Sequence, residues 1–390
     1  MKKILITVRH PGPAQTIAAI IPFLAEYYDR VILVASDAAL LMLQERFSSI
    51  LSMVDLYYRD NGRWTLYDGR WNNLIKGDIM EYSSENDCGF LELIEELAIL
   101  IQSCQADVVL RTTPALNWGV DEAVILACVK KKLTVKCCCY QEDYGCGVGL
   151  EQVPNSIAVI DLMAKKYLEK RNISAIVIGV LNQNLFKKFR PYQEARRQTR
   201  KKLGIVDREI VVLYCMGASG DKEAEMEHFL LFLESIGSQP VFLRFHPRNT
   251  EEERSLYREI SYSRSVRILD DLSYDGALSF SDYLVSAASA MNQDALQYQI
   301  FCGQVQLKTL SIYTQGAYTR RILESTTISA NYPASIEGMG SKIIAEDHLK
   351  EEQYHVEDEE RNRYSKEAEK RFGIKIEESI RRFYEYLNAD

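Results

Sequence analysis

Short apolar runs alternate with helix-period segments through the first half of the chain. β-Branched runs predict strands at residues 3–8, 30–35, 106–110 and 133–140. Apolar positions three and four residues apart predict helices at 14–28, 38–47, 89–103 and 121–131. Strands that alternate with helices are typical of a parallel sheet covered on both faces. Residues 55–85 break the pattern and predict an irregular insertion on one face of this sheet.

A second alternation follows a boundary within residues 183–204. Strands are predicted at 210–216, 240–245, 266–269 and 283–286, and helices at 222–235, 250–261, 276–279 and from 292 onward. The charged segment 358–387 carries apolar residues at helical spacing and predicts amphipathic helices that pack back on the body. We expect an α/β protein with two Rossmann-like, doubly wound domains that face a cleft. The domains are predicted at residues 1–185 and 186–357, and the closing helices at 358–390.

Charge and cysteine content narrow the function classes. The 47 Lys and Arg against 55 Asp and Glu give a net charge of −8, which argues against nucleic-acid binding. Nine cysteines are an odd number and Cys137 to Cys139 are consecutive, so we expect buried free thiols in a reducing, cytoplasmic compartment. Three adjacent residues alternate across a strand and cannot all bind one metal ion. No apolar run reaches the ~20 residues that span a bilayer, so any membrane contact is expected to be peripheral.

The candidate catalytic and binding residues of the first domain lie in the loops that follow strands. His10, Gly12 and Gln15 follow the first strand and open a helix, whose free amides can receive an anion or an acceptor hydroxyl. An ordinary strand-to-helix turn is the alternative. Glu142 and Asp143 follow another apolar strand, and neighbouring carboxylates raise one another's pKa, as a general base requires. A solvated acidic turn explains the pair equally well, and the choice between the two residues stays open.

In the second domain, three strand-to-helix turns carry small, basic or hydroxylated residues. The first turn holds Gly217 and Ser219, and the second holds Arg244, His246 and Arg248. Guanidinium groups bind phosphate bidentately, and an imidazole can donate a proton to a departing phosphate.

The third turn holds Ser286 and Ser289 before a helix that begins with Asn292 and Asp294. Its amides and hydroxyls predict an anion site, while Asn292 and Asp294 are candidates for ribose or sugar hydroxyls. Ser289 as a simple helix cap is the alternative.

The basic run at residues 187–202 has two interpretations, a solvated linker helix or a surface that contacts anionic lipid head groups. The aromatic residues of the 55–85 insertion, including Trp64 and Trp71, fit either an aromatic mini-core or stacking on the sugar rings of an acceptor. His228 has no partner at ligand spacing and is expected in solvent.

The linear order of these pieces resembles the GT-B superfamily of nucleotide-sugar enzymes over nearly the whole chain. The likeness rests on Arg244 and His246 at a strand end, Ser281 and Asp282 before the next strand, and a serine turn before Asp294. The nearest likeness is to bacterial surface-polysaccharide enzymes, including capsule and teichoic-acid-type transferases and sialyltransferases, and more distantly to non-hydrolysing UDP-GlcNAc 2-epimerases. The epimerase motif Gly-Thr-Arg-Pro-Glu does not follow the first strand, which favours transfer over epimerisation.

The resemblance implies a reaction and its residues. A metal-independent glycosyltransferase would move a sugar or polyol phosphate from a nucleotide-activated donor to a carbohydrate or lipid-linked hydroxyl acceptor, with no cofactor, at the inner face of the membrane. Asp143 or Glu142 would be the base, and His10, Gly12 and Gln15 would place the acceptor. The donor would contact Gly217, Ser219, Arg244, His246, Arg248, Ser286, Ser289, Asn292 and Asp294. An epimerase and a non-catalytic sugar-nucleotide-binding protein are the alternatives.

Overall fold

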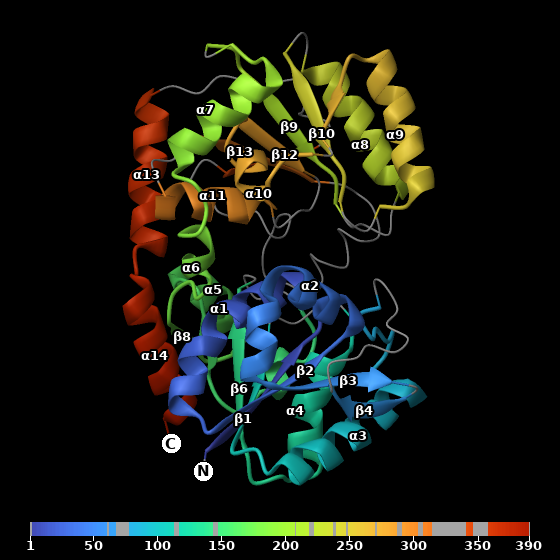
Figure 1. Ribbon diagram of the computed structural model, residues 1–390, viewed down its shortest axis with the longest axis vertical. Helices are drawn as coiled ribbons and strands as arrows, with labels where there is room; N and C mark the ends of the chain where they lie inside the picture. The colour runs from blue at the N-terminus through green and yellow to red at the C-terminus, as the bar shows by residue number, and fades with distance from the viewer. Residues whose placement is uncertain are drawn as a thin grey trace. The chain divides into compact units, whose positions relative to one another are not determined.

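The chain forms two compact α/β units in the computed structural model (Figure 1). Unit 1 comprises the described residues up to Asn184 together with those from Ile374 onward, and unit 2 comprises the described residues from Leu185 to Gly373. The structure describes residues 2–60, 62–67, 78–112, 117–142, 147–206, 208–217, 222–236, 239–246, 249–269, 271–286, 291–302, 307–313, 341–345 and 358–389.

Unit 1 is built on an eight-stranded sheet with the order β4-β3-β2-β1-β5-β6-β7-β8. The strands are β1 (Lys3–Val8), β2 (Arg30–Ala35), β3 (Asp55–Asp60), β4 (Arg63–Leu66), β5 (Val108–Arg111), β6 (Lys136–Gln141), β7 (Ile157–Val159) and β8 (Ala175–Val177). Every pairing is parallel except that of β3 with β4. The strand order reverses between β1 and β5, and ligands of open α/β sheets bind at such a point, beyond the carboxyl ends of the strands.

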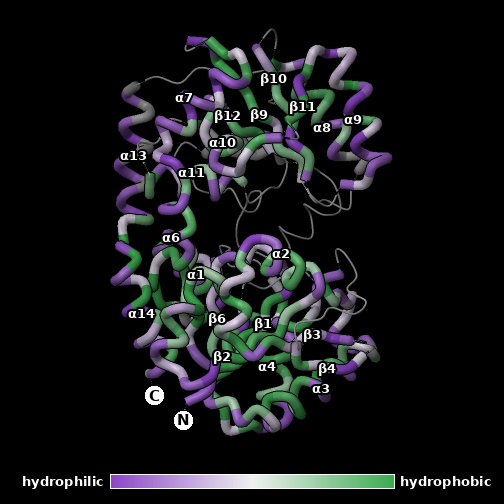
Figure 2. Tube along the Cα trace, viewed as in Figure 1, coloured by the Kyte–Doolittle hydropathy of each residue, from purple (hydrophilic) through white to green (hydrophobic). Residues whose placement is uncertain are grey.

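The helices of unit 1 begin where a polar side chain caps the free backbone amides. Ser36, Asp87 and Asp161 accept hydrogen bonds from the first turns of their helices. The helices are α1 (Pro11–Tyr27), α2 (Asp37–Phe47), α3 (Cys88–Cys104), α4 (Val120–Lys130), α5 (Leu162–Lys170) and α14 (Ile376–Asn388), with short helical turns η1 (Ser48–Met53) and η2 (Leu150–Gln152). Figure 2 shows the apolar residues concentrated on the central strands and on α4, which packs in the core with α3.

Unit 2 repeats the same reversal in a six-stranded, all-parallel sheet with the order β11-β10-β9-β12-β13-β14. The strands are β9 (Val212–Cys215), β10 (Val241–Arg244), β11 (Arg267–Ile268), β12 (Tyr283–Ser286), β13 (Lys308–Tyr313) and β14 (Ser341–Ala345). The helices are α7 (Tyr192–Leu203), α8 (Lys222–Ser235), α9 (Glu251–Ser263), α10 (Tyr274–Ala277), α11 (Met291–Cys302) and α13 (Asp358–Phe372), and α6 (Gln183–Phe186) spans the division between the units. The reversal lies between β9 and β12.

The predicted irregular insertion at 55–85 is wrong for its first part. Residues Asp55–Asp60 form β3 and extend the parallel sheet, and Arg63–Leu66 form the antiparallel edge strand β4. The aromatic residues fit the mini-core interpretation in part, since Tyr57 and Trp64 pack against the core of unit 1. Trp71 lies outside the described residues.

The two closing helices belong to different units. Helix α13 contacts α11 in unit 2, whereas α14 packs on unit 1. The Tyr386 hydroxyl bridges the Cys139 amide (2.9 Å) and the Ser156 carbonyl (2.8 Å). Gly179 has a φ of +101°, and a Cβ there would lie 2.3 Å from the Ser379 Oγ, so this contact with α14 requires glycine.

Candidate functional site

Three strands of unit 2 end level with one another at the carboxyl edge of the sheet. Cys215 at the end of β9 pairs in register with Arg244 of β10 on one side and with Ser286 of β12 on the other. Level residues of a parallel sheet point to the same face, so the three side chains lie in one row. This row flanks the point where the strand order reverses.

Arg244 is a basic group at this edge. Its guanidinium lies over the Tyr274 ring, 5.9 Å from the ring centroid, and is half-buried. Within the described residues it donates no hydrogen bond and has no carboxylate partner. Because a guanidinium offers five donors in a rigid fork, this group is prepared to bind an anionic ligand bidentately.

Ser286 adds a second polar group to this row, on the other side of Cys215 from Arg244. The side chain is fully buried, and its hydroxyl has no hydrogen-bond partner in the described part of the chain. Buried hydroxyl groups are usually paired, so one left at a strand end is typical of a group that a ligand or an ordered water completes.

The Arg244 guanidinium lies over the Tyr274 ring, and Tyr274 is hydrogen-bonded to Asp294. The Tyr274 hydroxyl donates a 2.5 Å hydrogen bond to Asp294 Oδ2 in the first turn of α11. Burial raises the pKa of the Asp294 carboxyl group to about 6, and the bond from Tyr274 lowers it only in part. Asp294, predicted to contact ribose or sugar hydroxyls, is therefore bonded to a tyrosine within unit 2.

Asp294→Asn is expected to change how stability depends on pH. The folded-state pKa of about 6 lies above the ordinary value of 3.8, so the folded protein binds the Asp294 proton more tightly than the unfolded chain does. The wild type therefore loses stability as the pH rises from about 4 to about 6, by roughly 3 kcal/mol for a shift near two pH units. Asparagine does not titrate.

Urea denaturation of both proteins between pH 4 and 8 tests this expectation. The stability of Asp294→Asn relative to wild type should rise across the window from about 4 to 6 and then stay level. A relative stability that is constant with pH would show that the carboxyl group titrates normally.

Three of the other predicted donor residues lie at the same edge. The Gly217 amide donates a hydrogen bond to the buried Glu225 carboxylate. His246 is held by its backbone, whose amide donates to Asn249 Oδ1 at 2.7 Å, and its side chain is half-buried. Asn292 is fully buried in the first turn of α11. Ser219, Arg248 and Ser289 lie outside the described residues.

The carboxyl edge of unit 1 carries a buried charge network that the sequence analysis above did not predict. Arg111, the last residue of β5, donates to Glu122 Oε1 at 2.9 Å, and Arg9 lies 3.5 Å from Glu122 Oε2. All three side chains are fully buried. Asp121 accepts hydrogen bonds from Thr7 (2.5 Å) and Thr112 (3.3 Å). Burial raises the pKa of both the Asp121 and Glu122 carboxyl groups, while the arginines oppose that rise.

This network fixes the loops around the strand ends. Arg111 donates to the carbonyls of Val148 and Gly149, and Arg9 donates to those of Ile79 and Asn117. Val148 and Gly149 lie just beyond residues 143–146, which separate them from Glu142. A usable signal was present in the sequence: arginines inside or directly after apolar strands, and two adjacent acids in the first turn of a helix.

The predicted base and acceptor residues of unit 1 follow β6 and β1. Glu142 accepts a 2.7 Å hydrogen bond from the Thr16 hydroxyl of α1, which joins the two loops. His10 precedes α1 as its cap residue, Gly12 is exposed and Gln15 is half-buried. Asp143 lies outside the described residues.

The basic run at 187–202 is divided between two roles. Arg196 and Arg200 both bind Asp282, at 2.5 and 3.3 Å, and Arg200 is 3% exposed. Arg190 binds Asp275 at 2.6 Å. Arg196 and Arg200 are mostly buried and fix α7 to Asp282, whereas the Arg190 side chain remains 35% exposed beside Asp275. The exposed basic residues of the run are Lys187, Lys188, Arg197, Lys201 and Lys202.

None of the helices in the described ranges is long and apolar enough to cross a membrane. Groups of three or more His, Cys, Asp or Glu side chains placed to hold a metal ion are also absent from those ranges. Cys137, Cys138 and Cys139 are buried free thiols, as the sequence predicted.

Comparison with known proteins shows the fold. No family model matches the chain, and no curated protein matches it in sequence. Among solved structures, S. aureus MnaA in a co-structure with UDP is 14% identical with a TM-score of 0.58, over 100% of this chain and 98% of the other. A glycosyltransferase from Rickettsia africae is 12% identical with a TM-score of 0.57, over 100% and 99%.

A third solved structure has the same architecture. The UDP-GlcNAc 2-epimerase from Neisseria meningitidis, bound to UDP-GlcNAc, is 13% identical with a TM-score of 0.55 over 100% of both chains. Each of the two doubly wound sheets has a strand-order reversal of its own. Together with these sheets, the similarities confirm the predicted fold. The chain has the GT-B fold.

Proposed function

We propose that this protein is a glycosyltransferase that uses a nucleotide-activated donor. Unit 2 would bind the donor and unit 1 would present a hydroxyl acceptor, as expected for surface-polysaccharide or glycoconjugate synthesis in bacteria. The observation that supports the proposal best is Arg244, a guanidinium at the end of a central strand without a carboxylate partner among the described residues. Two of the similar structures hold UDP and UDP-GlcNAc, which favours a nucleoside diphosphate at this edge.

The proposed mechanism divides the work between the two units. Arg244 would neutralise the leaving phosphate, the buried Ser286 hydroxyl would donate to one of its oxygens, and His246 would donate a hydrogen bond or a proton. Glu142 or Asp143 would take the proton of the acceptor hydroxyl as the bond to the donor carbon forms and the bond to the phosphate oxygen breaks. No metal ion is required, since cationic groups and amides can stabilise the leaving group.

A ligand panel tests the proposal directly. Because a ligand that binds only the native state raises the melting temperature, one of the CMP-, CDP-, UDP- and GDP-linked compounds should shift the melting curve upward at concentrations well above its Kd. Arg244→Gln should remove most of that shift while it leaves the melting temperature of the free protein close to wild type. A wild-type protein that responds to none of the four classes would contradict the proposal for these donors.

Epimerisation is the second candidate, and the similar UDP-GlcNAc 2-epimerase from Neisseria meningitidis, bound to UDP-GlcNAc, motivates it. An epimerase would convert UDP-GlcNAc without any acceptor, whereas a transferase releases the nucleotide only when it transfers the sugar or hydrolyses the donor. Proton NMR of UDP-GlcNAc incubated with the protein separates the two, because a C2 epimer has its own anomeric signal. A protein that binds a sugar nucleotide but turns it over in neither assay would be a non-catalytic sensor.

A further inference from the structure

Tyr274 is a residue of unit 2 to which the proposed donor site assigns no role. It opens the short helix α10, and the Arg244 guanidinium lies over its ring face, 5.9 Å from the centroid. The ring of Phe189 meets it edge-on, with 6.1 Å between centroids. Its hydroxyl donates to Asp294 Oδ2 at 2.5 Å. Three elements, β10, α10 and α11, therefore meet at one tyrosine.

We infer that Tyr274, oriented by Asp294, is a positioning residue that holds the Arg244 guanidinium ready for the phosphate of the donor. The inference rests on the proposed function and specifies how its phosphate-binding arginine is fixed. An arginine side chain loses about 2 kcal/mol of rotamer freedom when it is ordered, and a ring that already orders it removes much of that cost from ligand binding. The ring face attracts the cation and leaves all five N–H donors at its edge free for an anion.

The hydrogen bond to Asp294 fixes the plane of the ring. A phenyl ring held only by packing can turn about its Cβ–Cγ bond, whereas the hydroxyl bond to the first turn of α11 attaches the far end of Tyr274 to a second helix. Asp294 accepts this bond through Oδ2, so the tyrosine hydroxyl occupies one oxygen of its carboxylate.

A double-mutant cycle tests the inference. The affinity for UDP, and for inorganic pyrophosphate as a probe without a base, is measured by titration calorimetry for wild type, Tyr274→Leu, Arg244→Gln and the double variant. Tyr274→Leu should weaken binding about 2- to 30-fold, the range that a cation–π contact supports. In the Arg244→Gln background the same substitution should have no further effect, because Tyr274 acts only through the guanidinium. Tyr274→Phe keeps the ring face and should fall between wild type and Tyr274→Leu.

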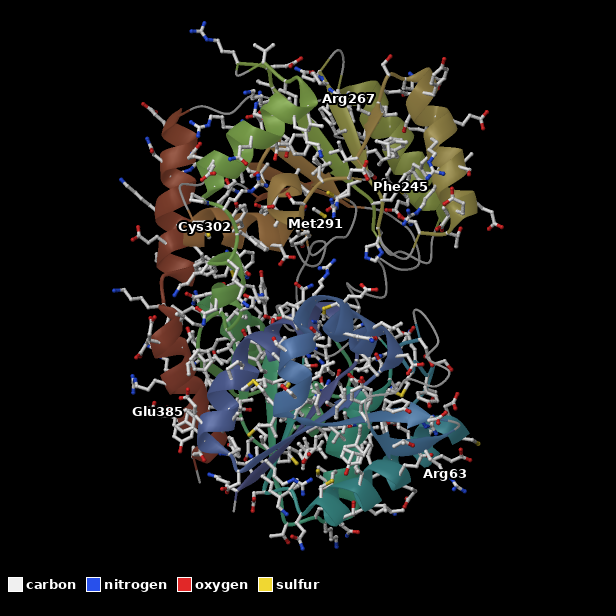
Figure 3. The ribbon with its side chains drawn as sticks, in the orientation of Figure 1. Arg63, Phe245, Arg267, Met291, Cys302 and Glu385 are labelled. Carbon is white, nitrogen blue, oxygen red and sulfur yellow. The ribbon has the colours of Figure 1, made fainter. Side chains whose placement is uncertain are left out.

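The control removes a comparable contact away from the site. The Arg267 guanidinium lies over the Phe242 ring at 4.9 Å, and Figure 3 shows Arg267 toward the end of unit 2 opposite Phe245 and Met291. Arg267→Gln should leave both affinities at the wild-type value. Melting temperatures of all variants identify any that fail to fold, and for those the Tyr274→Phe comparison replaces the leucine variant.

Each outcome has a distinct meaning. If Tyr274→Leu weakens binding equally with and without Arg244, the tyrosine is only structural and the inference is wrong. The same conclusion follows if Arg244→Gln weakens binding and no Tyr274 variant does. If the wild type binds neither probe, or if Arg244→Gln binds both as well as wild type does, the donor site itself is wrong and the proposed function fails with it.

Discussion

Glu122→Ala is expected to lower the free energy of unfolding by about 3–5 kcal/mol, the largest effect on stability that we predict. Glu122 is the shared partner of Arg9 and Arg111, and all three side chains are fully buried. Its removal takes the carboxylate partner from the buried Arg111 and leaves Arg9 with the partly exposed Glu81, whose Oε1 lies 3.0 Å away. An uncompensated buried charge such as that of Arg111 is costly. Urea denaturation followed by circular dichroism measures the change.

An exposed ion pair in the same unit provides the control. Lys131 binds Glu95 at 2.5 Å, and the two side chains are 39% and 60% exposed. Glu95→Ala should change the stability by less than about 1 kcal/mol, because solvent screens such a pair. A Glu122→Ala protein that loses no more than this control would show that the buried network contributes little.

His246→Ala is expected to lower the turnover number by about 100- to 10,000-fold, the range for loss of a general acid or base. The variant should keep its melting temperature, because the turn is held by the backbone. The His246 amide donates to Asn249 Oδ1 at 2.7 Å, and the Asn249 amide donates to the His246 carbonyl at 3.0 Å. Neither bond uses the imidazole. Steady-state rates with the donor that the ligand panel identifies provide the measurement.

His228 supplies a contrast to His246. It was expected in solvent, but it is 1% exposed on α8. His228→Ala should therefore lower the melting temperature through lost packing while the turnover number of the folded fraction changes little. If His246→Ala keeps the wild-type turnover number, His246 has no part in the proposed mechanism, whatever the result for His228→Ala.

Much of the fold could be predicted from hydrophobic periodicity. The bounds predicted for β2, α8 and β12 agree with the structure. β2 and β12 are short apolar runs between polar residues, and α8 is a longer segment of residues that favour helices. The pair β3 and β4 was missed because only Leu56 and Tyr58 are buried in β3, and two positions give a weak alternating signal. A strand near the sheet edge needs little apolar surface.

The candidate site was predictable only in its local parts. Arg244 and Ser286 could be placed at strand ends, and the register of the sheet brings them level with Cys215. The bond between Tyr274 and Asp294 joins residues from two helices, so no pattern within one element could reveal it. The same holds for Arg200 and Asp282, whose contact depends on how α7 packs against the loop before β12.

Helix α14 has a consequence for biosynthesis. Unit 1 is discontinuous, since its sheet comes from the first part of the chain while the hydroxyl that bridges Cys139 and Ser156 belongs to Tyr386. A ribosome therefore releases α14 only after unit 2 has emerged. The sheet of unit 1 is synthesised before unit 2 but is completed after it, and until α14 emerges the groups of Cys139 and Ser156 lack their tyrosine partner.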